Sequence, residues 1–189
     1  TTVQVIDDGC GMSPTDARLA FERHSTSKIQ TADDLFAIRT MGFRGEALAS
    51  IAAIAHLELK SKRVEDEIGT YIRIEGSRVE KQEPVQCPNG SNFTVKNLFF
   101  NVPARRKFLK KESTELNHIL KEFKRVVLAN PGLSFSLHHN NAVLFHLKPG
   151  KFGKRIVDVF GDNIRENLIP VKSDTRIVQI QGYVGHPGK

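Results

Sequence analysis

Two glycine-containing motifs constrain this chain more than any other feature of its sequence. In residues 7–11 (Asp-Asp-Gly-Cys-Gly), Asp7 stands at the end of a predicted strand, and the glycines let the backbone turn sharply and approach a ligand. Residues 42–48 (Gly-Phe-Arg-Gly-Glu-Ala-Leu) predict a loop that enters a helix from Gly45 to about His56. Free N–H groups at a helix start bind anions, and a carboxylate accepts from an amine such as that of adenine. Together the motifs favour a nucleotide pocket.

Each motif alone also has an ordinary structural explanation. D-x-G-x-G is a common sequence at the turn after a strand, and residues 42–48 could be a helix-terminating glycine followed by a core helix. The two occur here in a particular order, with the polar loop of residues 26–28 (Thr-Ser-Lys) between them. That combination favours the nucleotide interpretation over the structural one.

Four stretches between Val3 and Leu109 resemble, in order, the successive motifs of the MutL family, the ATPases of DNA mismatch repair. They are IDDGCGM, RHSTSKI, GFRGEALASI and LFFNVPARRKFL. MutL belongs to the GHKL superfamily, which also contains type II topoisomerase ATPase subunits, a heat-shock chaperone and sensor histidine kinases. D-x-G-x-G is common to the superfamily, whereas GFRGEAL and PARRKFL favour MutL. A related GHKL ATPase is the weaker alternative.

The resemblance implies ATP, with Mg2+, as cofactor, and it assigns roles to individual residues. Asp7 would accept from the adenine amine, and Met12 would pack on the base or sugar. Backbone N–H groups of residues 43–48 would bind phosphates, although Arg44 and Glu46 could instead brace a lid. The implied ATP-binding residues are Asp7, Gly9, Gly11, Met12, Thr26, Ser27, Lys28, Gly42, Phe43, Arg44, Gly45, Glu46, Ala47, Leu48 and Ser91, the last standing where the family has threonine.

The family's first motif precedes the D-x-G-x-G strand and supplies a water-orienting glutamate and an Mg2+-binding asparagine. Hydrolysis needs a positioned base and a metal, and this chain begins at the strand. We therefore expect a fragment of an ATPase whose parent hydrolyses ATP, with no catalytic residue and no Mg2+ ligand inside the fragment. The family's phosphate-contacting lysine is not assigned to Lys189. The family also implies a homodimer or paralogue heterodimer on ATP binding, with DNA and other mismatch-repair proteins as partners.

Basic residues are concentrated in one segment of a chain whose net charge is +7. Between Pro103 and Arg125 there are eight Lys or Arg residues and three Glu. Clustered basic charge is typical of nucleic-acid binding, although a solvated helix face is the common alternative. The candidate DNA-binding residues are Arg105, Arg106, Lys121, Lys124 and Arg125. A second hypothesis is therefore a basic nucleic-acid-binding module whose glycine motifs are structural turns, and a response to ATP analogues would separate it from the ATPase.

Other classes are disfavoured by composition. The two cysteines, Cys10 and Cys87, form neither a C-x-x-C pair nor a disulfide framework. His138 and His139 are adjacent on a predicted strand and point to opposite faces, so no metal site is predicted from side chains. No apolar run approaches the roughly 20 residues needed to span a bilayer. We expect no membrane partner and an intracellular location, cytoplasmic and nucleoid-associated in a bacterium or nuclear in a eukaryote.

The predicted fold is α+β, a two-layer α/β sandwich of the GHKL type. A mixed, mainly antiparallel sheet has helices on one face, and the nucleotide pocket lies between the layers. Ser13 and Pro14 predict a helix start, with the helix reaching about Glu22. The span from His24 to Gly45, with a brief helix near residues 31–39, predicts a flap where the family has its ATP lid, poorly ordered without nucleotide. Strands are predicted at 2–7, 57–62, 70–75, 91–96, 133–138, 142–147 and 176–182, and further helices at 113–129 and 152–160.

Pro149-Gly150 is the best candidate domain boundary. Residues 1–148 are predicted to form a GHKL-type ATP-binding domain that lacks its N-terminal helix. Residues 149–189 are predicted to be the truncated start of the family's second α/β domain.

Overall fold

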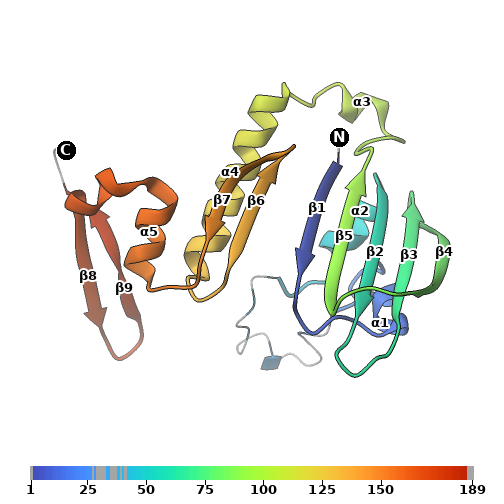
Figure 1. The fold of residues 1–189 in the computed structure, drawn as a ribbon, viewed down its shortest axis with the longest axis horizontal. Coiled ribbons are helices and arrows are strands. Elements are labelled where there is room, and N and C mark those ends of the chain that lie inside the picture. Colours follow the sequence, from blue (N-terminus) through green and yellow to red (C-terminus); the bar gives the residue numbers. More distant parts are fainter. Residues whose placement is uncertain are drawn as a thin grey trace. The chain divides into compact units, whose positions relative to one another are not determined.

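The computed structural model describes residues 2–26, 28, 33–34, 38, 40 and 42–186. The chain divides into two compact units, residues 1–109 and 110–189. Figure 1 shows the elements of both units along the chain.

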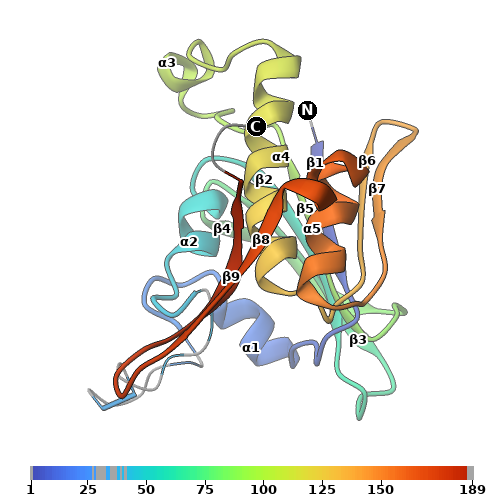
Figure 2. The same cartoon turned by 90° about the vertical axis from the view of Figure 1, so that its left-hand side faces the viewer.

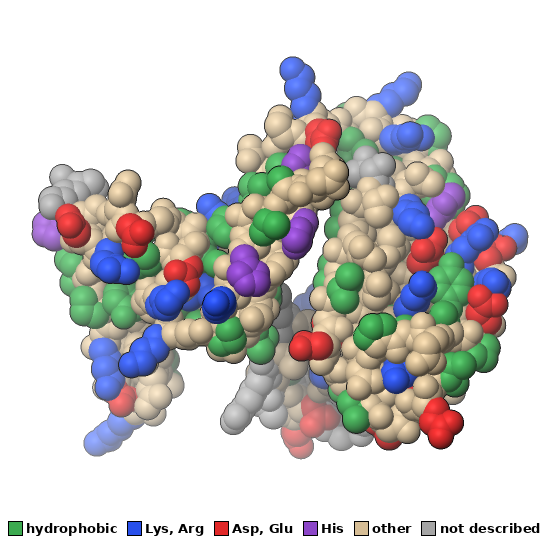
Figure 3. Space-filling model, viewed as in Figure 1, with side chains coloured by type: hydrophobic (Ala, Val, Ile, Leu, Met, Phe, Trp, Pro, Cys, Tyr) green, Lys and Arg blue, Asp and Glu red, His purple; other side chains and the backbone are tan. Residues whose placement is uncertain are grey.

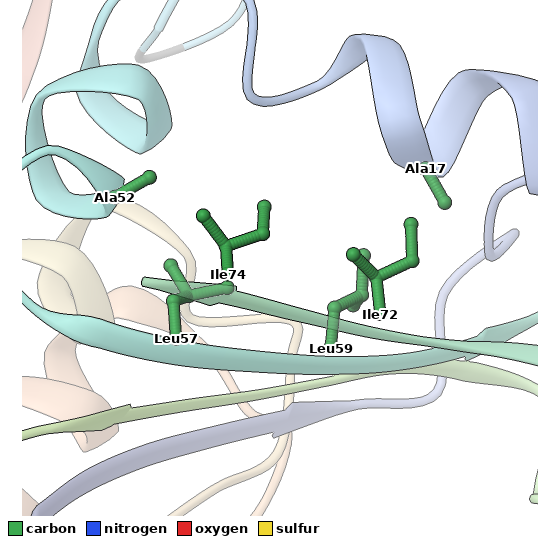
Figure 4. Close-up of a cluster of buried hydrophobic side chains, with 6 residues drawn as sticks. All are labelled: Ala17, Ala52, Leu57, Leu59, Ile72 and Ile74. Carbon is green, nitrogen blue, oxygen red and sulfur yellow. The ribbon is translucent and has the colours of Figure 1, made fainter. Parts of the chain in front are cut away.

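The first unit is built on a five-stranded sheet with strand order β1-β5-β2-β3-β4, and all of its strand pairings are antiparallel. Helices α1 and α2 lie on one face of this sheet (Figures 1 and 4). The predicted fold, an α/β structure with a mainly antiparallel sheet and helices on one face, is confirmed. The unit's elements are β1 (Thr2–Asp7), α1 (Pro14–Leu19), α2 (Ala47–Ala52), β2 (His56–Lys62), β3 (Gly69–Glu75), β4 (Arg78–Val85), β5 (Gly90–Lys96) and α3 (Pro103–Arg106).

The core of this unit lies between the sheet and its two helices. Leu57 and Leu59 alternate along β2, and they stand opposite Ile74 and Ile72 of β3 in the antiparallel register. All four side chains are at most 1% exposed. Figure 4 shows them directed toward the helix layer, where α1 contributes Ala17 and α2 contributes Ala52. Burial of each large side chain contributes roughly 1.5–3 kcal/mol, which holds the helices on this face.

The opposite face of the sheet carries charged side chains. Arg73 pairs with Glu75 at 3.0 Å, and Lys81 pairs with Glu83 at 2.8 Å. Figure 3 shows Lys and Arg side chains interspersed with Asp and Glu over β3 and β4. The strands are therefore amphipathic, as the alternating sequence predicts.

The second unit packs two helices against a hairpin. Its small core consists of Val127, Leu147 and Val159, with Phe123 and Phe135 packed against it. α5 lies beside α4 in both views (Figures 1 and 2). The unit's elements are α4 (Glu112–Ala129), β6 (Phe135–His139), β7 (Ala142–Leu147), α5 (Phe152–Phe160), the 3-10 helix η2 (Asp162–Asn167), β8 (Leu168–Asp174) and β9 (Gln179–Gly185).

A buried arginine joins the elements of the second unit. Arg155 is 1% exposed, and its guanidinium donates to the backbone carbonyls of Val127 at 2.9 Å, Leu133 at 2.6 Å and Lys148 at 3.0 Å. Further bonds reach the carbonyls of Asn130 and Pro131. Arg155 therefore ties the end of α4, the following turn and the end of β7 to α5, a role that the sequence did not predict.

The elements differ from the sequence-based predictions in several places. α1 ends at Leu19 rather than near Glu22, and α2 covers Ala47–Ala52 rather than residues 45–56. The predicted strand at 176–182 is found at Gln179–Gly185, and β4, α3 and β8 were not predicted. Six of the nine residues of the brief helix expected near residues 31–39, and ten of the 22 residues of the predicted flap, lie outside the described residues. The predicted domain division at 148/149 stays a prediction.

Within the described ranges, no helix combines the length and the apolar character that crossing a membrane would require.

Candidate nucleotide site

Asp7 ends β1, and its carboxylate begins the tight turn that follows. Asp7 Oδ1 accepts a hydrogen bond from the Gly9 N–H at 3.0 Å. A Cβ at Gly9 would lie 2.9 Å from the same oxygen, so residue 9 has little room for a side chain. An ionised carboxylate can accept several hydrogen bonds. The exposed Asp7 can therefore hold this turn and still accept from a ligand amine.

Two further glycines let this turn approach the neighbouring strands. Gly11 has φ +66°, and a Cβ there would lie 2.1 Å from the carbonyl oxygen of Lys62. Gly90 has φ +99°, and a Cβ there would lie 2.1 Å from the carbonyl oxygen of Asp7. Positive φ strongly favours glycine. The D-x-G-x-G turn is thus pressed against the ends of β2 and β5.

The turn after β2 is held by an ion pair. Arg63 donates to both carboxylate oxygens of Asp66, at 2.8 and 2.9 Å. This hydrogen bonding holds the pKa of the Asp66 carboxyl below its usual value. Because Arg63 directly follows Lys62, the pair supports the backbone on which Gly11 rests.

A row of polar residues crosses the strand ends next to Asp7. Asp7 stands opposite Ser91 of β5, and Ser91 stands opposite Ser61 of β2. Directly opposite residues on antiparallel strands point to the same face. Ser61 is fully buried and Ser91 is 8% exposed. The sheet therefore brings the predicted residues Asp7 and Ser91 to one end of one face.

Ser61 is the centre of a hydrogen-bond network that the sequence analysis missed. Its Oγ accepts from the Met12 N–H at 3.0 Å, donates to the Gly90 carbonyl at 3.0 Å and lies 3.0 Å from Ser91 Oγ. The network joins the D-x-G-x-G turn, β2 and β5. A signal was present in the sequence, because Ser61 continues the alternation of Leu57 and Leu59 and so places a hydroxyl at a core-facing position.

Most of the remaining predicted residues line one pocket. It has a volume of about 510 Å³, and Thr26, Lys28 and all of residues 42–48 line it, with Ala20 and Ser25. The Lys28 N–H donates to Thr26 Oγ1 at 3.1 Å. The guanidinium carbon of Arg44 lies 5.4 Å from the centre of the Phe43 ring. Two exposed cations and a glycine-rich backbone make this pocket chemically suited to an anion.

Residues 24–26 lie against the second glycine of the pocket loop. Gly45 has φ +66°, and a Cβ there would lie 2.2 Å from the carbonyl oxygen of Ser25. His24 Nδ1 lies 3.5 Å from Glu46 Oε1. The left-handed conformation of Gly45 also explains why α2 begins only at Ala47, since such a residue cannot belong to a right-handed helix. Gly45 and Glu46 are therefore loop residues, contrary to the predicted helix start.

Helix α1 connects the two groups of predicted residues along the chain. Met12 precedes α1 and Ala20, which lines the pocket, follows it. Ser13 caps the helix by accepting from the Asp16 N–H at 3.1 Å, as the sequence predicts. Ser27 lies outside the described residues.

The candidate DNA-binding residues occur in both units. Arg105 and Arg106 are in α3, and Lys121, Lys124 and Arg125 are on α4. Lys124 Nζ lies 5.2 Å from the centre of the Phe160 ring, and Arg125 pairs with Glu122 at 2.8 Å. Lys121 is exposed, as are Arg105 and Arg106. The DNA role of the set stays a prediction.

Among the described residues, no group of three or more His, Cys, Asp or Glu is placed to hold a metal ion.

Comparisons with known proteins place these features in context. The chain is 60% identical to the DNA mismatch repair protein MutL of Phocaeicola vulgatus over 187 residues, which is 99% of this chain and 30% of that protein. It is 59% identical to MutL of Bacteroides fragilis over the same extent. The resemblance to MutL is confirmed. The chain spans about 30% of the length of these MutL proteins, and no family model matches it.

The fold comparison agrees with the sequence comparison. The MutL ATPase domain of Aquifex aeolicus, solved in complex with ADP, matches with a TM-score of 0.68 and 26% identity. The match covers 91% of this chain and 60% of that domain. The structure thus has the fold of a MutL ATPase domain. The D-x-G-x-G turn and the glycine-rich pocket are parts of this fold.

Proposed function

We propose that this chain binds ATP and is the ATP-binding region of a MutL-type mismatch repair protein that hydrolyses ATP. One observation carries the proposal: the strand ends bring Asp7 beside Ser91, and α1 leads from that turn to a pocket containing Lys28 and Arg44. A carboxylate beside a hydroxyl suits the amine edge of adenine. Two cations and a glycine-rich loop suit phosphates.

The similar domain from Aquifex aeolicus was solved with ADP, which supports a nucleotide in this fold. In the proposed complex, Asp7 accepts from the base, and Lys28 and Arg44 neutralise phosphate charge. Mg2+ would accompany ATP and offset charge on the transferring phosphoryl group. We propose that its protein ligand is the asparagine of the family's first motif, which precedes the D-x-G-x-G strand in the parent.

We further propose that ATP binding promotes dimerisation of the parent, as a homodimer or paralogue heterodimer, and that DNA and other repair proteins are its partners. The contact between Gly45 and Ser25 supports a nucleotide-responsive lid, because phosphates bound at residues 43–48 would touch the loop on which residues 24–26 rest. Basic residues on α3 and α4 would bind DNA phosphates, at the nucleoid in a bacterium.

The test is equilibrium binding of a non-hydrolysable ATP analogue to the full-length parent carrying Asp7→Asn. The amide can still accept from the Gly9 N–H, so the turn should keep its shape, but the negative charge is lost. A hydrogen bond to a charged group contributes about 1.5–3 kcal/mol, so we expect affinity to fall about 10- to 150-fold. Asp8→Asn is the matched control, because Asp8 is the adjacent exposed carboxylate, and it should leave affinity unchanged. Wild-type affinity in the Asp7 variant would remove Asp7 from the base-binding role.

A second measurement separates the ATPase from a basic nucleic-acid-binding module. Sedimentation of the full-length protein with and without the analogue should show nucleotide-dependent dimers. A module whose glycines are only structural would bind DNA and show the same sedimentation in both conditions.

A further inference from the structure

We propose that Ser61 is a positioning residue that sets the base specificity of the nucleotide site, by fixing the direction of the Ser91 hydroxyl proton. The inference rests on the proposed ATP site. Ser61 itself is fully buried and lies one strand away from Ser91, so it would act on the base through Ser91.

The hydrogen bonds of Ser61 define where its single proton goes. A hydroxyl has one donor and two acceptor positions. The Gly90 carbonyl can only accept, so Ser61 donates to it at 3.0 Å. The Met12 N–H can only donate, so it occupies one lone pair of Ser61 Oγ at 3.0 Å. The remaining lone pair of Ser61 faces Ser91 Oγ at 3.0 Å, so the Ser91 hydroxyl must be the donor in this pair.

This arrangement makes Ser91 an acceptor toward any ligand. Its proton is directed to Ser61, and its lone pairs remain for other partners. Asp7 stands opposite Ser91 and, as a carboxylate, also only accepts. Two acceptors at one edge favour an exocyclic amine, as in adenine. They oppose a carbonyl oxygen at the same position, as in guanine, because two acceptors would face each other.

Removal of the Ser61 hydroxyl should therefore change selectivity. In Ser61→Ala, the Ser91 proton has lost its acceptor and can rotate to donate to a carbonyl on the base. We expect the preference of the full-length protein for an ATP analogue over the matching GTP analogue to fall about tenfold, the value of about one hydrogen bond.

Thr70→Val is the matched control. Thr70 stands opposite Ser61 on β3, is 3% exposed, and lies one strand farther from Asp7. This change removes a buried hydroxyl from the same row without touching the bond between Ser61 and Ser91. The ATP-to-GTP preference should stay at the wild-type value.

A double-mutant cycle distinguishes positioning from a general structural role. If Ser61 acts through Ser91, adding Ser61→Ala to Ser91→Ala should not change the nucleotide preference further. Equal weakening of both analogues by Ser61→Ala would overturn the proposal and leave Ser61 a structural residue. Should the alanine variant fail to fold, Ser61→Cys replaces it with the same expected loss of preference, since a thiol sulfur accepts a hydrogen bond only weakly. A wild-type protein that binds neither analogue would instead contradict the proposed ATP site itself.

Discussion

Gly45→Ala should damage the pocket loop, whereas the same change at Gly42 should not. Both glycines belong to the GFRGEAL motif and both line the pocket. Gly45 has φ +66°, and its added Cβ would lie 2.2 Å from the Ser25 carbonyl oxygen. Apart from the chain neighbours of Gly42, no described residue has a heavy atom within 4 Å of the equivalent position. The pair therefore compares one methyl group in two settings of the same loop.

The free-energy cost expected for Gly45→Ala has two parts. A non-glycine residue in the left-handed region costs roughly 1–2 kcal/mol. Overpacking against atoms that cannot move freely costs about 1–3 kcal/mol, and here the nearest atom is backbone. The total is about 2–5 kcal/mol. At Gly42 the added methyl contacts none of the described residues beyond its chain neighbours, so we expect the free energy of unfolding to change by at most about 0.5 kcal/mol.

The total can be divided between two measurable quantities. If the loop keeps its shape in the variant, the free energy of unfolding falls. If Ser25 moves away instead, the ATP analogue binds more weakly, and a loss of 2 kcal/mol corresponds to about 30-fold lower affinity. Urea unfolding and calorimetric titration of both variants measure the two effects. This explanation is refuted if Gly45→Ala and Gly42→Ala agree within about 0.5 kcal/mol in the free energy of unfolding and also in the free energy of analogue binding.

Three further predictions concern other parts of the chain. Arg155→Met should lower the free energy of unfolding by at least about 3 kcal/mol in urea denaturation, because it leaves several backbone carbonyls without their donor. The folded-state pKa of Asp66 lies below its usual value of 3.8, chiefly because Arg63 donates to its carboxylate. Its contribution to stability should therefore be present above pH 3.8 and be lost as the pH falls through the folded value, so thermal melts of Asp66→Asn and wild type should converge in acid. Reversing the charges of Lys121 and Lys124 should weaken DNA binding by the parent and reduce the slope of log affinity against log salt by about 2, while ATP-analogue binding without DNA changes little.

Each of these has a control within the chain. Arg165→Met removes an exposed arginine that pairs with Asp162 at 3.6 Å, and it should barely change stability. Glu67→Gln neutralises an exposed carboxylate beside Asp66 and should leave the acid part of the melting profile unchanged. Charge reversal of Arg78 and Lys81 on β4 matches the lysine variant in charge. If it weakens DNA binding equally, net charge rather than α4 explains the effect.

β1, β7 and α5 have the bounds that the sequence predicted. β2, β3 and β5 agree with their predicted ranges to within one residue, and the long α4 does so too. β4 was missed because it is an edge strand in which most residues are exposed and half are charged, so its apolar alternation is weak. α2 begins two residues later than predicted because the left-handed conformation of Gly45 depends on its contact with Ser25, which no local pattern reveals.

The candidate site shows the same division between local and long-range information. The glycine motifs and Asp7 are recognisable as short sequence patterns, and the pocket gathers most of the residues that the motifs predicted. Ser61 could not be identified in this way because its importance comes from strand register, which places it beside Ser91 and under Met12. Arg155 was missed for a similar reason, since most of its carbonyl partners, such as those of Val127, Pro131 and Leu133, lie 22 to 28 residues away in sequence.

The central claim is that a nucleotide binds between the D-x-G-x-G turn and the glycine-rich pocket. Hydrogen exchange of the full-length protein, measured by mass spectrometry at saturating ATP analogue, tests it most directly. We predict slower exchange in peptides covering residues 7–12 and 42–48, and little change in peptides covering the edge strand β4. Saturable binding without protection of residues 7–12 and 42–48 would contradict the account.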